Sequence, residues 1–202
     1  MRLFSDRMGT NPRRVIIYLK EKGLDIELVN VDTAAGEHRQ AAFLARNPAG
    51  KIPVLQLDDG SYLSESAAIV EYLEELFPAP PMIGATPAGR GRARSLERIA
   101  TDLIARTAIM VYHGHPHFAG RVTQQPVVAE AMRPMVSELL ATLEQHIGTR
   151  TFLAGEQPTI ADCSTFALFQ TCRHRLKLAY GAEYPRLDAW YARFVQRPSA
   201  DY

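Results

Sequence analysis

Residues 47–55 of the chain are Asn-Pro-Ala-Gly-Lys-Ile-Pro-Val-Leu, and they predict a turn that leads into a short buried strand. The pairs Asn-Pro and Ala-Gly are typical of turns, whereas Ile52, Val54 and Leu55 favour a strand. Pro53 cannot donate to a sheet, and an X-Pro bond adopts the cis form at a cost of only about 0.5–1 kcal/mol. We therefore expect a cis Ile52–Pro53 bond that presents the main chain of Val54 to a peptide-like ligand. An ordinary edge turn is the alternative.

A second motif begins nine residues after Leu55, at residues 64–69, which are Ser-Glu-Ser-Ala-Ala-Ile. Together the two motifs resemble the glutathione-binding half of the cytosolic glutathione transferases, including bacterial members. The resemblance implies an α/β thioredoxin-like N-terminal domain, expected over residues 1–78, and an all-α C-terminal domain, expected over residues 87–202. Residues 79–86 are the expected linker.

The composition is that of an ordinary globular protein. Hydrophobic residues make up 47% of the chain and charged residues 22%, and the length of 202 residues allows one large or two small domains. A net charge of +1 gives no overall attraction to nucleic acid or to a membrane surface. No apolar run approaches the roughly 20 residues that a membrane-spanning helix needs, and the first residues do not resemble a signal peptide. We expect a cytoplasmic protein.

Cys163 and Cys172 are the only cysteines, and they lie nine residues apart in an apolar stretch. This spacing fits neither a redox pair nor a metal-binding knuckle. Both are expected to be buried free thiols in a reducing compartment.

The first half of the chain alternates strand and helix patterns. Strands are expected at residues 2–5 and 26–31, after Pro53, and at 61–63, with a turn at 58–60. Helices are expected from Asn11 as N-cap to Gly23 as C-cap, over residues 36–46, and from Ser64 as N-cap to about Phe77. This order of elements is that of a thioredoxin-like domain.

The helix start at residues 64–66 is a candidate anion site, because free N–H groups and the helix dipole favour negative charge there. The resemblance places the α-carboxylate of the γ-glutamyl group of glutathione on Ser66 and its ammonium beside Glu65. Lys51 and, less strongly, His38 are the basic groups that could meet the glycine carboxylate, while Ile52, Pro53 and Val54 would hold the peptide. The alternative is that this segment only caps a helix.

The position that activates the thiol departs from the family pattern. Family members place a Tyr, Ser, Cys or Thr before the first helix, and the usual serine position falls on Gly9, which has no side chain. A thiolate at neutral pH needs its pKa lowered from about 8.5 by nearby donors. Asn11 is our first candidate for this role, since disulfide-reductase-like members keep an asparagine there, and Thr10 is the second. Alternatively, both residues only cap the helix.

The second half predicts a helical domain. Helices are expected from Pro87 to about Tyr112, over residues 126–147, from a capping box at Thr159 and Asp162, and from about Pro185. The inner residues expected for the helix over 126–147 are Ala131, Met135, Leu139, Leu140 and Leu143. The resemblance assigns the capping box to the start of the central core helix, and hence to folding rather than catalysis. The arginines between residues 90 and 98 are expected to be a solvated face or a dimer rim, not a nucleic-acid site.

Three histidines alternate in His113-Gly-His115-Pro-His117, which raises the question of a metal site. Gly114 and Pro116 argue against a regular strand that would aim the rings together, so no metal is expected. The resemblance instead suggests that Tyr112, His113 and Phe118 line the pocket for an electrophile.

The resulting hypothesis is a glutathione transferase that activates the thiol of glutathione, its co-substrate, for attack on a small hydrophobic electrophile. Two alternatives remain: a glutathione-dependent disulfide reductase, favoured by Asn11, and a non-catalytic binding or assembly module, favoured by Gly9. A homodimer is implied by the resemblance alone.

Overall fold

The computed structural model describes residues 1–201, which form two compact units. The N-terminal unit comprises Met1–Met82 together with the segment that begins at Arg197, and the helical unit comprises Ile83–Gln196. The expected linker at residues 79–86 spans the change from one unit to the other. Each unit is described below by itself.

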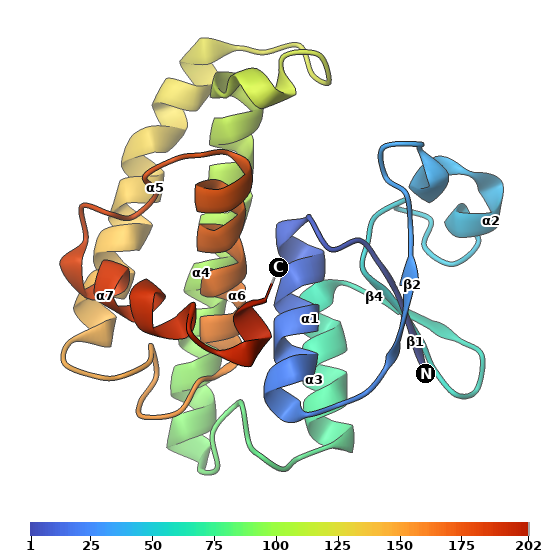
Figure 1. Ribbon diagram of the computed structural model, residues 1–202, viewed down its shortest axis with the longest axis horizontal. Helices are drawn as coiled ribbons and strands as arrows, with labels where there is room; N and C mark the ends of the chain where they lie inside the picture. Colours follow the sequence, from blue (N-terminus) through green and yellow to red (C-terminus); the bar gives the residue numbers. More distant parts are fainter. Residues whose placement is uncertain (202) are drawn as a thin grey trace. The chain divides into compact units, whose positions relative to one another are not determined.

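A four-stranded sheet forms the centre of the N-terminal unit (Figure 1). Its strands are β1 (Arg2–Ser5), β2 (Glu27–Asn30), β3 (Val54–Gln56) and β4 (Tyr62–Ser64). They lie in the order β2-β1-β3-β4, with β1 parallel to β2 and antiparallel to β3, which is antiparallel to β4. The mixed sheet and its flanking helices confirm the predicted thioredoxin-like domain.

The two faces of the sheet are covered by different helices. Helices α1 (Thr10–Lys22) and α3 (Ser66–Leu76) lie side by side on one face (Figure 1), against which Leu3 and Leu55 are fully buried. On the other face, Phe4 and Val54 pack with Phe43 of α2 (Ala41–Leu44). Neighbouring residues of a strand point to opposite faces of the sheet. Leu3 and Phe4 of β1 therefore lie on opposite faces, and so do Val54 and Leu55 of β3.

Three predicted helix boundaries were wrong. The helix expected over residues 36–46 is a 3-10 turn, Glu37–Arg39, followed by the short α2, because Gln40 between them is extended (φ −76°, ψ 150°). Helix α1 begins at Thr10, with Gly9 rather than Asn11 as N-cap, since Asp6 Oδ1 accepts from the N–H groups of Met8 and Gly9 just before it. Ser64 belongs to β4, and Glu65 is the N-cap of α3.

The helical unit contains four long helices, and their ranges confirm the predicted pattern. They are α4 (Pro87–Gly114), α5 (Pro126–Ile147), α6 (Ile160–Gln170) and α7 (Pro185–Phe194), with a 3-10 turn at Pro116–Phe118 and a π-turn at Thr171–Arg175. Every residue of α6 is buried, as expected of the central core helix. Within residues 1–201, none of the helices combines the length and apolar character that a membrane crossing needs.

The buried face of α5 differs from the expected one. Ala131 and Met135 were predicted to point inward, but both are exposed. The buried residues follow a different helical stripe, which consists of Ala129, Val136, Leu140, Leu143 and Ile147. Residues 131 and 135 lie off this stripe because a helix advances about 100° per residue.

The predicted capping box is confirmed at the start of α6. The carboxylate of Asp162, which has no exposed surface, accepts from the N–H and hydroxyl of Thr159. It also accepts from the N–H of Leu153 at 2.9 Å and from Trp190 Nε1 at 2.9 Å. One side chain thus joins α6 to the preceding loop and to α7, which supports a role in folding.

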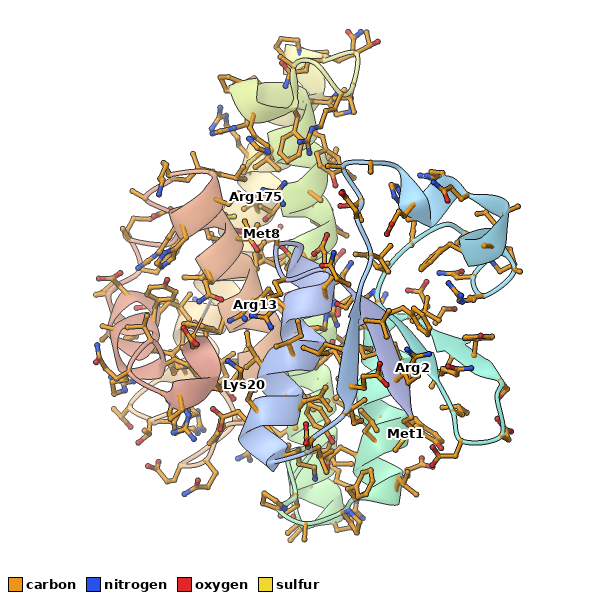
Figure 2. The ribbon with its side chains drawn as sticks, turned by 45° about the vertical axis from the view of Figure 1, so that its right-hand side comes forward. Met1, Arg2, Met8, Arg13, Lys20 and Arg175 are labelled. Atoms are coloured by element: carbon orange, nitrogen blue, oxygen red, sulfur yellow. The ribbon has the colours of Figure 1, made fainter. Side chains whose placement is uncertain are left out.

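The C-terminal segment packs on α1 within the N-terminal unit. The guanidinium of Arg13, only 1% exposed, donates to the carbonyl of Asp201 at 2.9 Å and to that of Ala200 at 3.4 Å. Lys20, labelled with Arg13 on α1 in Figure 2, also reaches Asp201. Arg197 donates two hydrogen bonds of 2.7 Å to the carboxylate of Glu21. The segment is therefore part of the N-terminal unit although the helical unit precedes it in the sequence.

Candidate active site

A polar hollow in the N-terminal unit brings the predicted site motifs together. Its lining comes from the start of α1, the loop before β3 and the start of α3, and consists of Asn11, Asn47, Lys51, Ile52, Pro53, Glu65 and Ser66. Six of these seven residues were predicted from the sequence to bind or activate a ligand. Asn47 was recognised only as part of a turn.

Asn47 fixes the loop before β3. Its Nδ2 donates to the carbonyl of Lys51 at 2.7 Å, and its Oδ1 accepts from the N–H of Ala49 at 3.1 Å. Gly50 follows with a positive φ of 57°, and a Cβ there would lie 2.9 Å from the carbonyl oxygen of His38, so only glycine fits. The Ile52–Pro53 bond is cis, as predicted. The loop therefore holds the backbone at residues 51–53 in one fixed arrangement at the edge of the hollow.

The start of α3 contributes a candidate anion site to the same hollow. Glu65 is its exposed N-cap, and Ser66, 6% exposed, is the first helical residue. The N–H groups of a first helical turn have no partners within the helix, and the positive end of the dipole lies there. A carboxylate of a ligand fits this position, with the Glu65 carboxylate beside it for a cationic group.

Glu65 adopts a strained backbone conformation, with φ 69° and ψ 111°. Such strain in a residue other than glycine costs on the order of 1–3 kcal/mol and clusters at ligand sites. We expect Glu65→Gly to be more stable than Glu65→Ala by about 1 kcal/mol, because glycine relieves the strain while both variants lack the carboxylate. Urea unfolding of the two variants measures the difference. Equal stabilities would show that the conformation at Glu65 is not strained.

Asn11 lines the hollow from the first turn of α1. Its Oδ1 accepts a hydrogen bond of 3.0 Å from Nη2 of Arg14, one turn further along the helix. Gly9, at the usual serine position, is the N-cap with φ −83° and provides no side-chain cap. Asn11 is therefore the only side chain of the α1 start that, among the described residues, lines this hollow.

Known proteins share both units of this chain. The family models described as "Glutathione S-transferase, N-terminal domain" and "Glutathione S-transferase, C-terminal domain" match residues 10–76 and 100–198. Glutathione S-transferase 2 of Saccharomyces cerevisiae is 30% identical over an alignment that covers 98% of this chain and 87% of the yeast protein. The chain belongs to the glutathione S-transferase family.

Two further similarities bear on this transferase. The maleylacetoacetate isomerase of Pseudomonas aeruginosa is 35% identical over 80% of this chain and 76% of its own length. A glutathione S-transferase of Methylobacterium radiotolerans, known from a crystal structure in complex with glutathione sulfonate, is 28% identical to this chain in sequence. The alignment covers 98% of this chain and 91% of that one, and the two structures superpose with a TM-score of 0.80. The relatives are enzymes by name, and the fold and the transferase function predicted from the sequence are confirmed.

The other predicted contacts in the N-terminal unit of the transferase lie outside this lining. His38 is in the 3-10 turn before α2, where its Nδ1 is buried without a hydrogen-bond partner. Val54 is fully buried and pairs with Phe4 and Ser64. Thr10 is the first residue of α1 and does not line the hollow. Their contacts with a ligand stay predictions.

The expected electrophile residues of the transferase lie near the C-terminal end of α4. The rings of Tyr112 and Phe118 meet edge to face with centroids 4.6 Å apart, and Tyr112 is 44% exposed. His113 Nδ1 accepts from the N–H of Gln125 at 3.2 Å. The exposed ring of Tyr112 and the partly buried ring of Phe118 thus form one aromatic pair, and its role toward an electrophile stays a prediction.

The alternating histidines have structural partners. His115 Nδ1 accepts a hydrogen bond from the N–H of His117, and His115 Nε2 lies 3.1 Å from the carbonyl oxygen of Leu176. Desolvation, and then the charges of Arg175 and Arg121, lower the pKa of His117, which favours its neutral ring. Among the residues that the structure describes, no three side chains of the metal-binding types are grouped to hold an ion.

The two cysteines of the transferase are buried and form no disulfide, as predicted. Burial raises the pKa of Cys172 to about 12, so the fraction of thiolate at neutral pH is on the order of 10⁻⁵. Cys172 is therefore held as the neutral thiol at neutral pH.

Proposed function

We propose that this transferase binds glutathione in the hollow of the N-terminal unit and activates its thiol for attack on a small apolar electrophile. One observation carries the proposal: Asn11, the loop at residues 51–53 and the helix start at residues 65–66 line the same hollow. A relative of the same fold is known with glutathione sulfonate bound. A site of this kind needs an anion pocket, a peptide-binding edge and a thiol donor, and the hollow contains a candidate for each.

The charges of glutathione match the charged groups of the hollow. The α-carboxylate of the γ-glutamyl group binds the main-chain N–H and the hydroxyl of Ser66, and its ammonium binds the carboxylate of Glu65. The main chain at Ile52, Pro53 and Val54 holds the cysteinyl residue as an added strand would be held. Lys51, with His38, binds the glycine carboxylate.

The thiol then lies by the start of α1. An N–H of Asn11 donates to the sulfur, and the helix dipole adds to the stabilisation of the thiolate, with Thr10 as the second candidate donor. The thiol proton leaves to solvent. The sulfur forms a bond to the electrophilic carbon, and the leaving group departs with the electron pair of its bond. Tyr112, His113 and Phe118 are the proposed contacts of the electrophile.

A second candidate activity is the reduction of disulfides by glutathione. It is favoured by Asn11 at a site where Gly9 provides no hydroxyl or thiol. Activity with a chlorodinitrobenzene and with hydroxyethyl disulfide distinguishes the two reactions. We further propose that the protein acts in the cytoplasm as a homodimer.

Glutathione affinity tests the proposal. Glu65→Gln and Ser66→Ala are each expected to raise the Kd for glutathione about tenfold or more, because each removes a contact to a charged group of the ligand. Titration calorimetry measures the Kd. Glu75→Gln is the matched control, since Glu75 is exposed in the last turn of α3. A wild-type protein that does not bind glutathione would overturn the proposal, and unchanged Kd values in both variants would move the site elsewhere.

A further inference from the structure

We propose that Arg14 is a positioning residue that orients the Asn11 amide so that its N–H groups face the thiol of glutathione. This inference rests on the proposed function, since it concerns the same hollow and assumes that the thiol lies beside Asn11. It assigns a role to a buried arginine that the sequence pattern marked only as part of a helix.

The contact itself determines which end of the amide faces the hollow. A guanidinium has five N–H donors and no acceptor. The Asn11 oxygen therefore turns toward Nη2 of Arg14, at 3.0 Å, whereas the opposite orientation would set N–H groups against N–H groups. With the oxygen held by Arg14, Nδ2 and its two donors are the end of the amide that remains for a ligand.

Arg14 is suited to hold this orientation. It is 4% exposed, so its guanidinium is fixed by packing, whereas Asn11 is exposed at the edge of the hollow. An asparagine in water rotates about its terminal bond and presents oxygen or nitrogen with similar ease. A thiolate repels the oxygen and accepts from the nitrogen, so fixing the amide in advance avoids the orientation that would oppose thiolate formation. The charge of Arg14 also strengthens the hydrogen bond that it donates.

The adjacent arginine shows that burial alone does not produce this role. Arg13 is 1% exposed, but its guanidinium donates to the carbonyls of Ala200 and Asp201 in the C-terminal segment. Two neighbouring buried arginines of α1 thus serve different parts of the N-terminal unit. Arg13→Met is therefore the matched control for Arg14→Met, because it removes the same charge from the same turn of the helix.

The pKa of the bound glutathione thiol, measured by the ultraviolet absorbance of the thiolate against pH, is the direct readout. Arg14→Met is expected to raise this pKa by about one unit, a tenfold change in the ionisation constant. The value of kcat/KM should fall about tenfold at pH values below the wild-type pKa and recover at pH values above the new pKa. The Kd of S-methylglutathione, which has no ionisable thiol, should stay within about twofold of the wild type. Arg13→Met should leave the thiol pKa unchanged.

The double variant Asn11→Ala with Arg14→Met tests whether Arg14 acts through Asn11. Positioning predicts that the double variant has the thiol pKa of Asn11→Ala alone. A further rise in the double variant would show that Arg14 acts through its own charge and would overturn the inference. The inference would also be overturned if Asn11→Ala raised the thiol pKa while Arg14→Met left it unchanged. No change in Asn11→Ala itself would instead remove Asn11 from the proposed function.

Arg14→Lys is the second variant if Arg14→Met does not fold. It keeps the positive charge but loses the planar fork that holds the amide. Positioning predicts a thiol pKa between those of the wild type and Asn11→Ala. A wild-type pKa in Arg14→Lys would show that charge alone suffices, which would contradict the inference.

Discussion

Asp162→Asn is expected to destabilise the helical unit by about 3 kcal/mol or more. The two carboxylate oxygens accept four hydrogen bonds, from Thr159, Leu153 and Trp190. In asparagine one oxygen becomes an NH₂ group, which sets donors against donors at a site without exposed surface. Hydrogen bonds to a buried charged group are each worth about 1.5–3 kcal/mol, and breaking such a network leaves other polar groups buried without partners.

Thermal unfolding followed by circular dichroism measures the loss. For a chain of this length, about 3 kcal/mol corresponds to a Tm lower by roughly 6–12 °C. Asp102→Asn is the control, because Asp102 forms a partly exposed pair with Arg106 one turn away and such pairs contribute only about 0.3–0.5 kcal/mol. If Asp162→Asn and Asp102→Asn unfolded at similar temperatures, the capping box would not have the structural role described above.

The largest expected effect on activity comes from Asn11→Asp. The new carboxylate would pair with Arg14 as the amide oxygen does now, but its second oxygen would place negative charge beside the thiol. It would also remove the N–H donors. We expect kcat/KM at neutral pH to fall about a hundredfold, compared with about tenfold for Asn11→Ala, because a nearby like charge raises the pKa of an acid by one or more units beyond the loss of a donor.

The dependence of kcat/KM on pH separates this effect from damage to the fold. For Asn11→Asp the rate should rise steadily with pH as the thiolate forms, while the Kd of S-methylglutathione stays close to that of the wild type. If the two Asn11 variants lost activity equally, the charge beside the thiol would be irrelevant. If neither lost activity, Thr10 would become the leading candidate for the thiol donor.

The motifs could be predicted from the sequence because their structure is local. The cis bond before Pro53 and the capping box at Thr159 each depend on residues within a few positions of one another. The same local rules misplaced the N-cap of α1, because Gly9 has no side chain and Asp6 provides the acceptor from outside the helix.

Other parts of the site depend on contacts that the sequence does not reveal. Asn47 could have been noticed as a polar residue before a glycine turn, but its hydrogen bond to Lys51 is visible only in the folded loop. The pairing of Arg14 with Asn11 has the spacing of a helix contact, yet nothing in the pattern shows that Asn11 lines the hollow. The burial of Arg13 under the C-terminal segment joins residues 188 positions apart, and no local rule can predict it.

That segment also affects the order in which the protein can be completed during synthesis. The ribosome makes the sheet, α1 and α3 first, and then the whole helical unit, before Arg197 emerges. Until then the contacts that Arg13 and Glu21 make with this segment cannot form. The N-terminal unit therefore reaches its final structure only after the helical unit has been translated.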